Sequence, residues 1–308
     1  MAHYTTADQI DLSSVADRYG LTGASLTVLS GGAANSSFRL TCDQGEYVLT
    51  SLDNHHEDTA NTLARHTRAF HRLGLPTSEV VPATDGSLIV RVEDRLLVLK
   101  RWIAGTVEQP LPPALLPEAG NLLARLHALA PDADGLIDVP IGARRLSAEH
   151  LASVPDFADQ EFARWLTSRL DRVRDAEADS HRTSCLIHGD LFDDNVIVRD
   201  DGGLSVLDWE TVSLDDPLLD LGMAAVGLAQ DEAGFLDTER LHALLDGYEK
   251  LRPLTTVDRA ILPLEIEHAA LIIAFHRYHR HNVRFPNPER ATYHRAMVRF
   301  AESVAARI

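Results

Sequence analysis

The sequence predicts an α+β fold of two lobes, in which a small antiparallel sheet precedes a mostly helical region. Short apolar runs separated by turn residues fill residues 24–51 and predict strands. Beyond Trp102, apolar residues recur at helical spacing over most of the chain. A strand-loop-strand block at 185–208 interrupts the helical region, and a polar loop lies between its strands.

The N-terminal lobe is predicted from strands, one hairpin and two helices. Ser25–Leu29 alternates polar and apolar residues, as a half-buried strand does. Asp43–Gly45 is a turn sequence between two strand-like runs and predicts a β-hairpin. The expected elements are a helix at 7–19, strands at 25–29, 37–42 and 46–50, a helix at 57–73, and strands at 87–91 and 96–100.

The C-terminal lobe is predicted to follow a short hinge. The sequence places the N-terminal lobe at 1–100, the hinge at 101–106 and the helical lobe at 107–308, with no flexible linker. A chain of 308 residues can bury the cores of both. Helical spacing occurs at 114–129, 158–175, 215–229, 233–249, 255–281 and 287–306.

Composition and charge exclude several classes of protein. With 45% hydrophobic and 24% charged residues the chain is typical of soluble globular proteins, and its net charge of −17 argues against nucleic-acid binding. No apolar run has the length of a membrane span and the N-terminus lacks a signal-peptide core, so we expect a cytoplasmic protein. Cys42 and Cys185 are the only cysteines, which excludes a disulfide framework.

The loop within 185–208 carries polar residues at a spacing typical of phosphoryl transfer. Asp190 follows His188 by two residues, Asn195 follows Asp190 by five, and Asp208 follows Asn195 by thirteen. This is the catalytic-loop spacing of protein-kinase-like folds, with a metal-binding aspartate further on. Asp and Asn are also common turn residues, but the second aspartate after another strand-like run favours the kinase interpretation.

Phosphoryl transfer explains these residue types. The protein must orient the attacking hydroxyl and accept its proton, and it must hold Mg²⁺ against the phosphates with oxygen ligands. Asp190 suits the first role, and Asn195 with Asp208 suits the second. His188 is expected to brace the loop through hydrogen bonds.

The chain resembles the aminoglycoside phosphotransferase and choline kinase superfamily, which shares the protein-kinase fold, over residues 20–305. The sequences H-G-D-L-F-D-D-N-V at 188–196 and D-W-E at 208–210 carry most of the resemblance. The segment D-P-L-L-D-L at 216–221 is similar to the family's D-P-x-x-D-L segment. The resemblance implies ATP or GTP as phosphate donor, Mg²⁺ as metal, and a supporting role for Asp220 at the catalytic loop.

Within this superfamily the chain is most similar to bacterial homoserine kinases that use the kinase fold. Residues 29–38 are similar to their G-x-x-N-x-N-F segment, and 43–50 to their Q-G-x-Y-V-L-T strand. In many kinases that strand carries a lysine for the α- and β-phosphates. In this chain the corresponding position is Thr50, and no lysine precedes Lys100. Homoserine kinases of this type similarly lack the strand lysine. We therefore expect the loop at 30–37 to cover the phosphates.

The predicted nucleotide-binding residues come from two places. One is the Gly-rich turn with its neighbouring strands, and the other is the hinge, whose backbone groups are expected to meet adenine. Taken alone, a Ser-Gly-Gly turn is usually only a turn, and a hinge is usually only a connection. The predicted residues are Ser30, Gly31, Gly32, Ser36, Ser37, Thr50, Lys100, Arg101 and Trp102.

The acceptor pocket is predicted from fewer signals. Arg277 or Arg280 is expected to bind an acceptor carboxylate, although a surface cluster of His and Arg is the commoner explanation of that segment. Glu210 either meets a cationic acceptor or forms a surface ion pair. H-G-D stands where homoserine kinases often have H-A-D, and D-W-E where they have D-F, which leaves the acceptor open.

The sequence therefore predicts a small-molecule kinase that transfers the γ-phosphate of ATP or GTP to a hydroxyl of a homoserine-like or amino-alcohol metabolite. The alternative is an O-phosphotransferase for aminoglycoside or nucleoside antibiotics. A pseudokinase is a third interpretation, which the missing strand lysine suggests and the intact Asp190, Asn195 and Asp208 argue against. We expect a monomer or homodimer without nucleic-acid or membrane partners.

Overall fold

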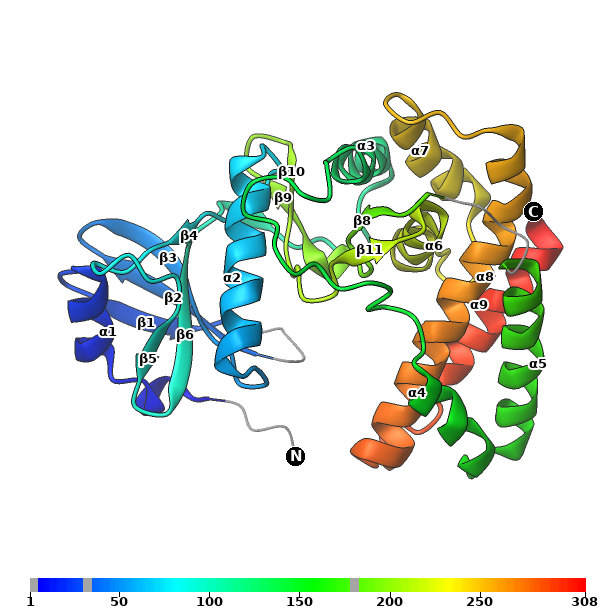
Figure 1. Cartoon of the computed structure of the whole chain (residues 1–308), viewed down its shortest axis with the longest axis horizontal. Helices are drawn as coiled ribbons and strands as arrows, with labels where there is room; N and C mark the ends of the chain where they lie inside the picture. The colour runs from blue at the N-terminus through cyan, green and yellow to red at the C-terminus, as the bar shows by residue number, and fades with distance from the viewer. Residues whose placement is uncertain (1–4, 30–34, 178–182) are drawn as a thin grey trace. The chain divides into compact units, whose positions relative to one another are not determined.

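The computed structural model of the chain describes residues 5–29, 35–177 and 183–308 (Figure 1). The chain forms two compact units, and neither is continuous in sequence. No helix within the described ranges is both long and apolar enough to cross a bilayer. The first unit comprises Met1–Thr106, Asp132–Asp138 and Ile197–Glu210, and the second comprises Val107–Pro131, Val139–Val196 and Thr211–Ile308.

The first unit is built on an antiparallel sheet with the strand order β1-β2-β3-β6-β4, and β5 also pairs with β6. The predicted hairpin joins β2 to β3 and pairs Cys42 with Gly45. Gly45 has a φ of 124°, a conformation that favours glycine. The strands are β1 (Ser25–Val28), β2 (Ser36–Cys42), β3 (Gly45–Ser51), β4 (Val80–Val81), β5 (Val90–Val92) and β6 (Arg95–Arg101).

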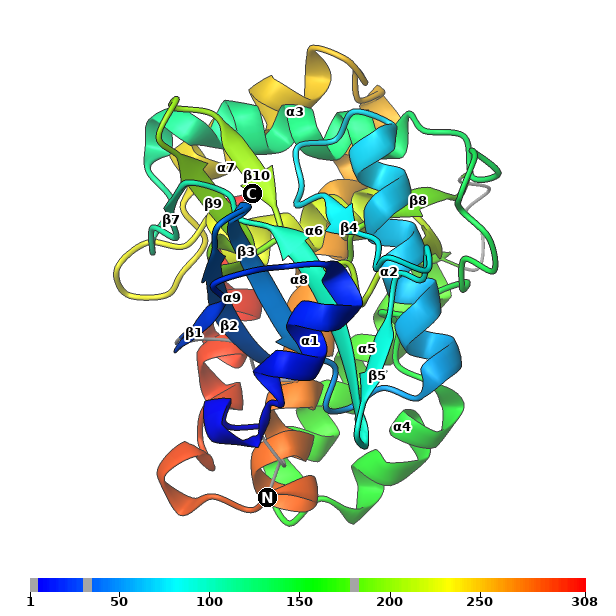
Figure 2. The same ribbon diagram turned by 90° about the vertical axis from the view of Figure 1, so that its left-hand side faces the viewer.

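Two helices cover the two faces of this sheet (Figures 1 and 2). On one face Leu97 of β6 packs in an apolar cluster with residues of α1 (Leu12–Tyr19). On the other face Val98 packs in a second cluster with residues of α2 (Glu57–Arg72). Because successive residues of a strand face opposite sides, Lys100 lies on the same face as Val98.

A small sheet of order β10-β9-β7 brings a distant part of the chain into the first unit. A Cβ atom on Gly105 would lie 2.2 Å from the carbonyl oxygen of Val198, so only glycine permits this pairing. Val206 also donates its backbone N–H to the carbonyl of Pro76 at 2.8 Å. The D-W-E segment after β10 therefore belongs to the first unit. The strands are β7 (Gly105–Thr106), β9 (Val196–Arg199) and β10 (Leu204–Val206).

Helices dominate the second unit, as the periodicity predicts. In Figure 1, α8 lies between α6 and α9, and a Cβ atom on Gly222 of α6 would lie 2.4 Å from the carbonyl oxygen of Glu265 on α8. A π-helical turn at His279–Arg284 follows α8. The helices are α3 (Leu116–His127), α4 (Ala148–Ser153), α5 (Gln160–Glu177), α6 (Pro217–Leu228), α7 (Thr238–Glu249), α8 (Thr256–Tyr278) and α9 (His294–Arg307).

Short elements complete the two units. The strands β8 (Cys185–Ile187) and β11 (Ser213–Asp215) pair antiparallel in the second unit. The helix α4 and the strand β4 were not expected from the sequence, because both are too short to show a clear period. Single 3₁₀ turns lie at Ala7–Gln9, Pro113–Leu115, Val154–Asp156, Asp193–Asn195 and Pro288–Arg290.

Candidate active site

The predicted catalytic loop (188–195) leaves β8 through a turn in which Gly189 has a positive φ. The hydroxyl of Thr211 donates a 2.7 Å hydrogen bond to the carbonyl of His188 and closes the turn. Gly189 has a φ of 77°, and a Cβ atom there would lie 3.1 Å from the carbonyl oxygen of Thr211. Glycine at position 189 therefore favours this conformation of the loop.

The buried carboxylate of Asp220 holds the start of the loop from α6. Its two oxygens accept the backbone N–H groups of His188 at 2.8 Å and Gly189 at 2.7 Å. His127 lies 2.9 Å from the same carboxylate, and its other ring nitrogen lies 2.9 Å from the hydroxyl of Tyr248. Burial opposes ionisation of Asp220, but these hydrogen bonds outweigh it and lower the pKa of the carboxyl.

Asp190 and Asn195 are brought together within the loop. The Nδ2 atom of Asn195 donates to the backbone carbonyl of Asp190 at 2.8 Å and lies 3.3 Å from its Oδ2. The backbone N–H of Asp190 donates to Nδ1 of His188 at 3.2 Å, so His188 braces the loop. The Oδ1 atom of Asn195 accepts no hydrogen bond from the described residues, which leaves a hard oxygen available as a metal ligand.

Arg144 contacts Asp190 and was missed by the sequence analysis. Its Nη2 atom donates a 2.6 Å hydrogen bond to Oδ1 of Asp190, and both side chains are largely buried. The segment around Arg144 is irregular, and the two residues are 46 positions apart. No local pattern could have revealed this pair.

The D-W-E segment is held in the first unit by Trp209. This side chain is buried, lies 4.3 Å from the ring of Phe70 between centroids, and donates from Nε1 to the hydroxyl of Thr77 at 2.9 Å. Asp208 has a φ of 58°, and its Oδ1 accepts the backbone N–H of Glu210 at 3.2 Å. Backbone strain at a non-glycine residue is often found at functional sites, and here it coincides with the predicted metal ligand.

The negative charge of the predicted metal-binding aspartate, Asp208, acts on Lys100. This lysine is partly buried near the end of β6, and burial lowers its pKa while the negative charges of Asp208 and Glu210 act in the opposite direction. Thr50 pairs with Val98 on the same face of the sheet, and its hydroxyl lies 3.3 Å from that of Ser37. The face of the sheet that carries the strand lysine in many kinases thus has Thr50 on β3 and Lys100 on the adjacent strand β6.

Glu210 is bonded to residues of its own unit. Its carboxylate accepts a short hydrogen bond from Nδ2 of Asn35 and lies 3.3 Å from Nε2 of His55. Burial would raise the pKa of Glu210, but His55, Asn35 and the charge of Lys100 together lower it. Glu210 therefore has hydrogen-bond partners within the first unit, and its two predicted roles stay predictions.

The structure describes only some of the other predicted nucleotide-binding residues, and these contact different parts of the first unit. Ser30, Gly31 and Gly32 lie outside the described residues. The hydroxyl of Ser36 donates to Asp53 at 2.6 Å. Arg101 ends β6 and donates to the hydroxyl of Tyr47 at 3.0 Å, while Arg39 stacks on Trp102 at 4.5 Å.

The two arginines predicted for the acceptor differ in exposure. Arg277, on α8, is partly buried; burial lowers its pKa and the negative charge of Asp194 raises it. Arg280 is exposed in the π-helical turn. Their neighbour His276 lies near Arg144, and burial with that positive charge lowers the pKa of His276 to about 3. His276 is therefore a neutral imidazole at physiological pH.

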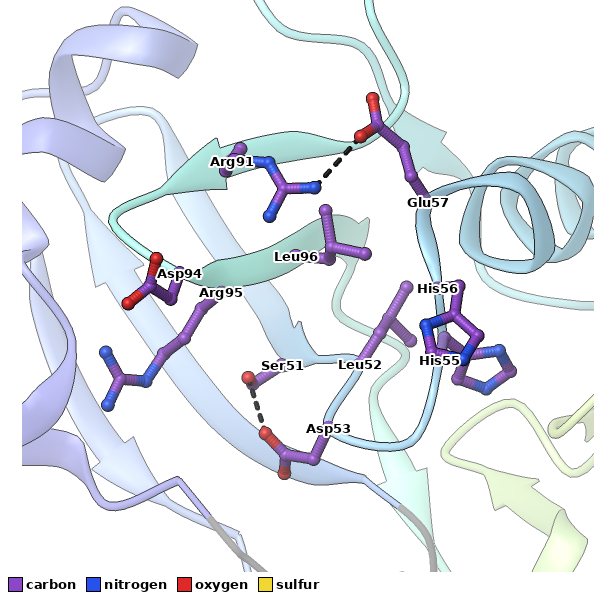
Figure 3. A pocket seen from close by; sticks show the side chains of 10 residues that line it. All are labelled: Ser51, Leu52, Asp53, His55, His56, Glu57, Arg91, Asp94, Arg95 and Leu96. Atoms are coloured by element: carbon purple, nitrogen blue, oxygen red, sulfur yellow. Dashed lines mark hydrogen bonds and ion pairs between the residues drawn. The ribbon is translucent and has the colours of Figure 1, made fainter.

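The first unit also has a polar pocket, whose lining includes Ser51, Asp53, Glu57 and Arg91 (Figure 3). Its charged groups are partly paired, since Arg91 donates to Glu57 at 2.9 Å and Ser51 donates to Asp53 at 2.8 Å. None of the predicted catalytic or metal-binding residues lines it. We therefore assign it no part in phosphoryl transfer.

Most of the chain is similar in sequence to known proteins. A sequence model of the phosphotransferase enzyme family matches residues 25–254. A protein of Methylobacillus flagellatus named homoserine kinase is 30% identical over 79% of this chain and 76% of its own length. A protein of the same name from Neisseria meningitidis serogroup B is 28% identical over 85% of this chain and 86% of its own.

Solved structures show the same fold at low sequence identity. An amicoumacin kinase with bound AMP-PNP and Ca²⁺ has a TM-score of 0.73 at 15% identity, covering 98% of this chain and 94% of its own. A microcompartment-associated aminopropanol kinase has a TM-score of 0.66 at 18% identity, covering 96% of this chain and 95% of its own. The predicted kinase-like α+β fold is thereby confirmed.

Proposed function

This chain belongs to the phosphotransferase enzyme family, and on that premise we propose that it transfers the γ-phosphate of ATP to the hydroxyl of homoserine or a closely similar amino acid. The observation that carries the proposal is Asp190, held by Asn195 in a loop fixed by the buried Asp220. The relatives named homoserine kinase support the acceptor. The AMP-PNP and Ca²⁺ bound to the amicoumacin kinase support ATP, rather than GTP, with a divalent metal.

Asp190 is the group that orients the acceptor hydroxyl and takes its proton as the oxygen–phosphorus bond forms. The products are a phosphate monoester and ADP. Asn195 and Asp208 are the proposed ligands of Mg²⁺, and their amide and carboxylate oxygens are the donors this ion prefers. Mg²⁺, when bound, neutralises charge on the β- and γ-phosphates.

We also propose that Lys100 supplies the cation that other kinases place on the strand equivalent to β3. Its face is that of Thr50 and Ser37, and the charges of Asp208 and Glu210 act on it. A lysine there meets the phosphates as a point charge. Glu210 then takes the place of the glutamate that pairs with the lysine in protein kinases.

The pair of Asp190 with Arg144 argues for an amino acid over a polycationic antibiotic. An antibiotic rich in ammonium groups would be recognised by carboxylates without a neighbouring cation. Around Asp190 the described charge partner is the guanidinium of Arg144. Repulsion from that guanidinium would disfavour a polyamine at this position.

The test is Mg²⁺-dependent ADP release from ATP with homoserine, threonine, serine, ethanolamine, choline, aminoglycosides and nucleoside antibiotics. We expect stimulation by homoserine and loss of at least about 100-fold in kcat for Asp190→Asn, the scale of a general base. The variant should retain the thermal stabilisation that Mg-ATP gives the parent protein. If only an antibiotic stimulates ADP release, the acceptor is an antibiotic and not homoserine. If ATP binds but no phosphate is transferred to any acceptor, the pseudokinase interpretation is favoured.

A further inference from the structure

We infer that Arg144 binds the carboxylate of the acceptor, so the acceptor class is a short hydroxy amino acid. The inference rests on the proposed kinase function and adds the residue that selects the substrate. It gives Arg144 the role that the sequence suggested for Arg277 or Arg280. The carrying observation is the direct contact between Arg144 and Asp190.

The backbone around Arg144 is fixed on both sides, so its side chain is directed by the fold. Before it, Gly142 donates its N–H to the carbonyl of Leu214 at 3.0 Å. After it, Arg145 donates from Nε to both oxygens of Asp215 at 2.9 and 2.8 Å, and from Nη1 to Glu177. Arg144, in contrast to its neighbour, reaches the predicted catalytic carboxylate.

The guanidinium of Arg144 is incompletely satisfied. Its side chain is 16% exposed, and its Nε atom is buried without a hydrogen-bond partner among the described residues. A buried donor without a partner costs free energy, so a ligand that supplies an acceptor is favoured there. A planar carboxylate matches adjacent N–H groups of a guanidinium.

Charge balance also favours a second anion beside Arg144 during phosphoryl transfer. Asp190 is the one ion-pair partner of Arg144 among the described residues. The nearby His276 is neutral, since burial and the charge of Arg144 lower its pKa to about 3. Once Asp190 has taken the proton of the acceptor hydroxyl it is neutral, and Arg144 is then a largely buried cation without an ionic partner among the described residues. An acceptor with its own carboxylate restores the balance, and a cationic amino alcohol does not.

The contact also limits the length of the acceptor. The guanidinium and the carboxylate of Asp190 are in direct contact at 2.6 Å, so groups bound by the two must be near each other. A molecule with only a few carbon atoms between its hydroxyl and its carboxylate meets this condition. Serine and homoserine are molecules of this kind.

The test compares two acceptors that differ in one group. Homoserine carries the carboxylate, and 3-amino-1-propanol is the same molecule without it. We expect the parent protein to prefer homoserine by at least about 100-fold in kcat/KM, because a site built for a polar group rejects the analogue that lacks it. Arg144→Ala should reduce this ratio below about tenfold, mainly by raising the KM for homoserine, and Arg144→Lys should keep part of it.

Arg164→Ala, a change at an exposed arginine of α5, is the matched control and should keep the full ratio. Calorimetric binding of homoserine to an Asp190→Asn protein, with and without Arg144→Ala, gives a readout independent of turnover. Equal losses for both acceptors in Arg144→Ala would show that Arg144 only positions Asp190, and would overturn the inference. Equal use of both acceptors by the parent protein would overturn it and leave the kinase function intact. No transfer to any hydroxyl would end both proposals.

Discussion

The Nε2 atom of His127 lies 2.9 Å from Oδ2 of Asp220, and both side chains are completely buried next to the predicted catalytic loop. Burial lowers the pKa of His127 although Asp220 favours its charged form. A neutral His127 donates to Asp220 and accepts from Tyr248, and an ionised Asp220 accepts the two backbone N–H groups of the loop. The position of Asp190 thus depends on two protonation states in the core.

Buried histidines and the buried Asp220 make the free energy of unfolding depend on pH in the acid range. His127 and His276 have folded pKa values below the ordinary 6.5, so the unfolded chain binds protons that the native state excludes. Their contribution is complete above pH 6.5 and is lost as the pH falls, at up to about 1.4 kcal/mol per pH unit for each histidine. Asp220, whose pKa is lowered from 3.8, adds a further loss below about pH 4.

Urea unfolding at pH 8, 6.5 and 5.5 measures this dependence. His276→Gln should flatten the profile between pH 6.5 and 5.5, because it removes one of the histidines that the native state keeps neutral. His242→Gln, at an exposed position of α7, should leave the profile unchanged. If the free energy of unfolding of His276→Gln falls as steeply with pH as that of the parent protein, the native state does not keep His276 neutral.

Lys100→Met should raise the KM for ATP and lower kcat, together by about 10²-fold or more in kcat/KM, because a cation directed at the phosphates is lost. The chain has only one other lysine, Lys250, which is exposed and makes Lys250→Met a matched control. A lysine-reactive acyl-phosphate form of ATP should label Lys100, and Mg-ATP should protect it. Labelling of Lys250 alone would refute the role of Lys100.

Gly189→Ala should destabilise the protein by about 1–2 kcal/mol, because alanine is strained at a φ of 77°. The added Cβ atom, 3.1 Å from the carbonyl oxygen of Thr211, should also displace the loop and lower kcat more than the affinity for ATP. Gly202→Ala is a suitable comparison, since it shares a positive φ of 85° but has no atom within 4 Å of the added carbon. Equal kcat values in the two variants would show that the close approach is unimportant.

Asp208→Asn should weaken the affinity for Mg-ATP and leave the affinity for ATP without metal nearly unchanged, because it removes the charge but keeps an oxygen. Its φ of 58° is tolerated by asparagine, so little change in stability is expected. Titration of nucleotide with and without Mg²⁺ measures both affinities. A loss of affinity that is the same with and without metal would assign Asp208 to the nucleotide alone.

Features that depend on neighbours in sequence could be predicted. The turn at Asp43–Gly45 forms the β2–β3 hairpin, and the helical spacing of 255–281 gives α8 with its π-helical extension. The spacing of His188, Asp190 and Asn195 indicated one polar loop, and the side chains of His188 and Asn195 both hydrogen-bond to the backbone of Asp190. Short-range geometry fixes such features, because a strand, turn or loop of a few residues has few alternatives.

Local sequence patterns predicted the α+β class, the order of most elements and the residue types of the proposed phosphoryl-transfer loop. The assembled fold was needed to show that Arg144 reaches Asp190, that Glu210 bonds to Asn35 across 175 positions, and that Lys100 shares a face with Thr50. These relationships depend on which strands pair and how an irregular segment is fixed, and no periodic pattern records either. Long-range contacts become favourable only after the chain has closed large loops, so they follow from the assembled core rather than from local preference.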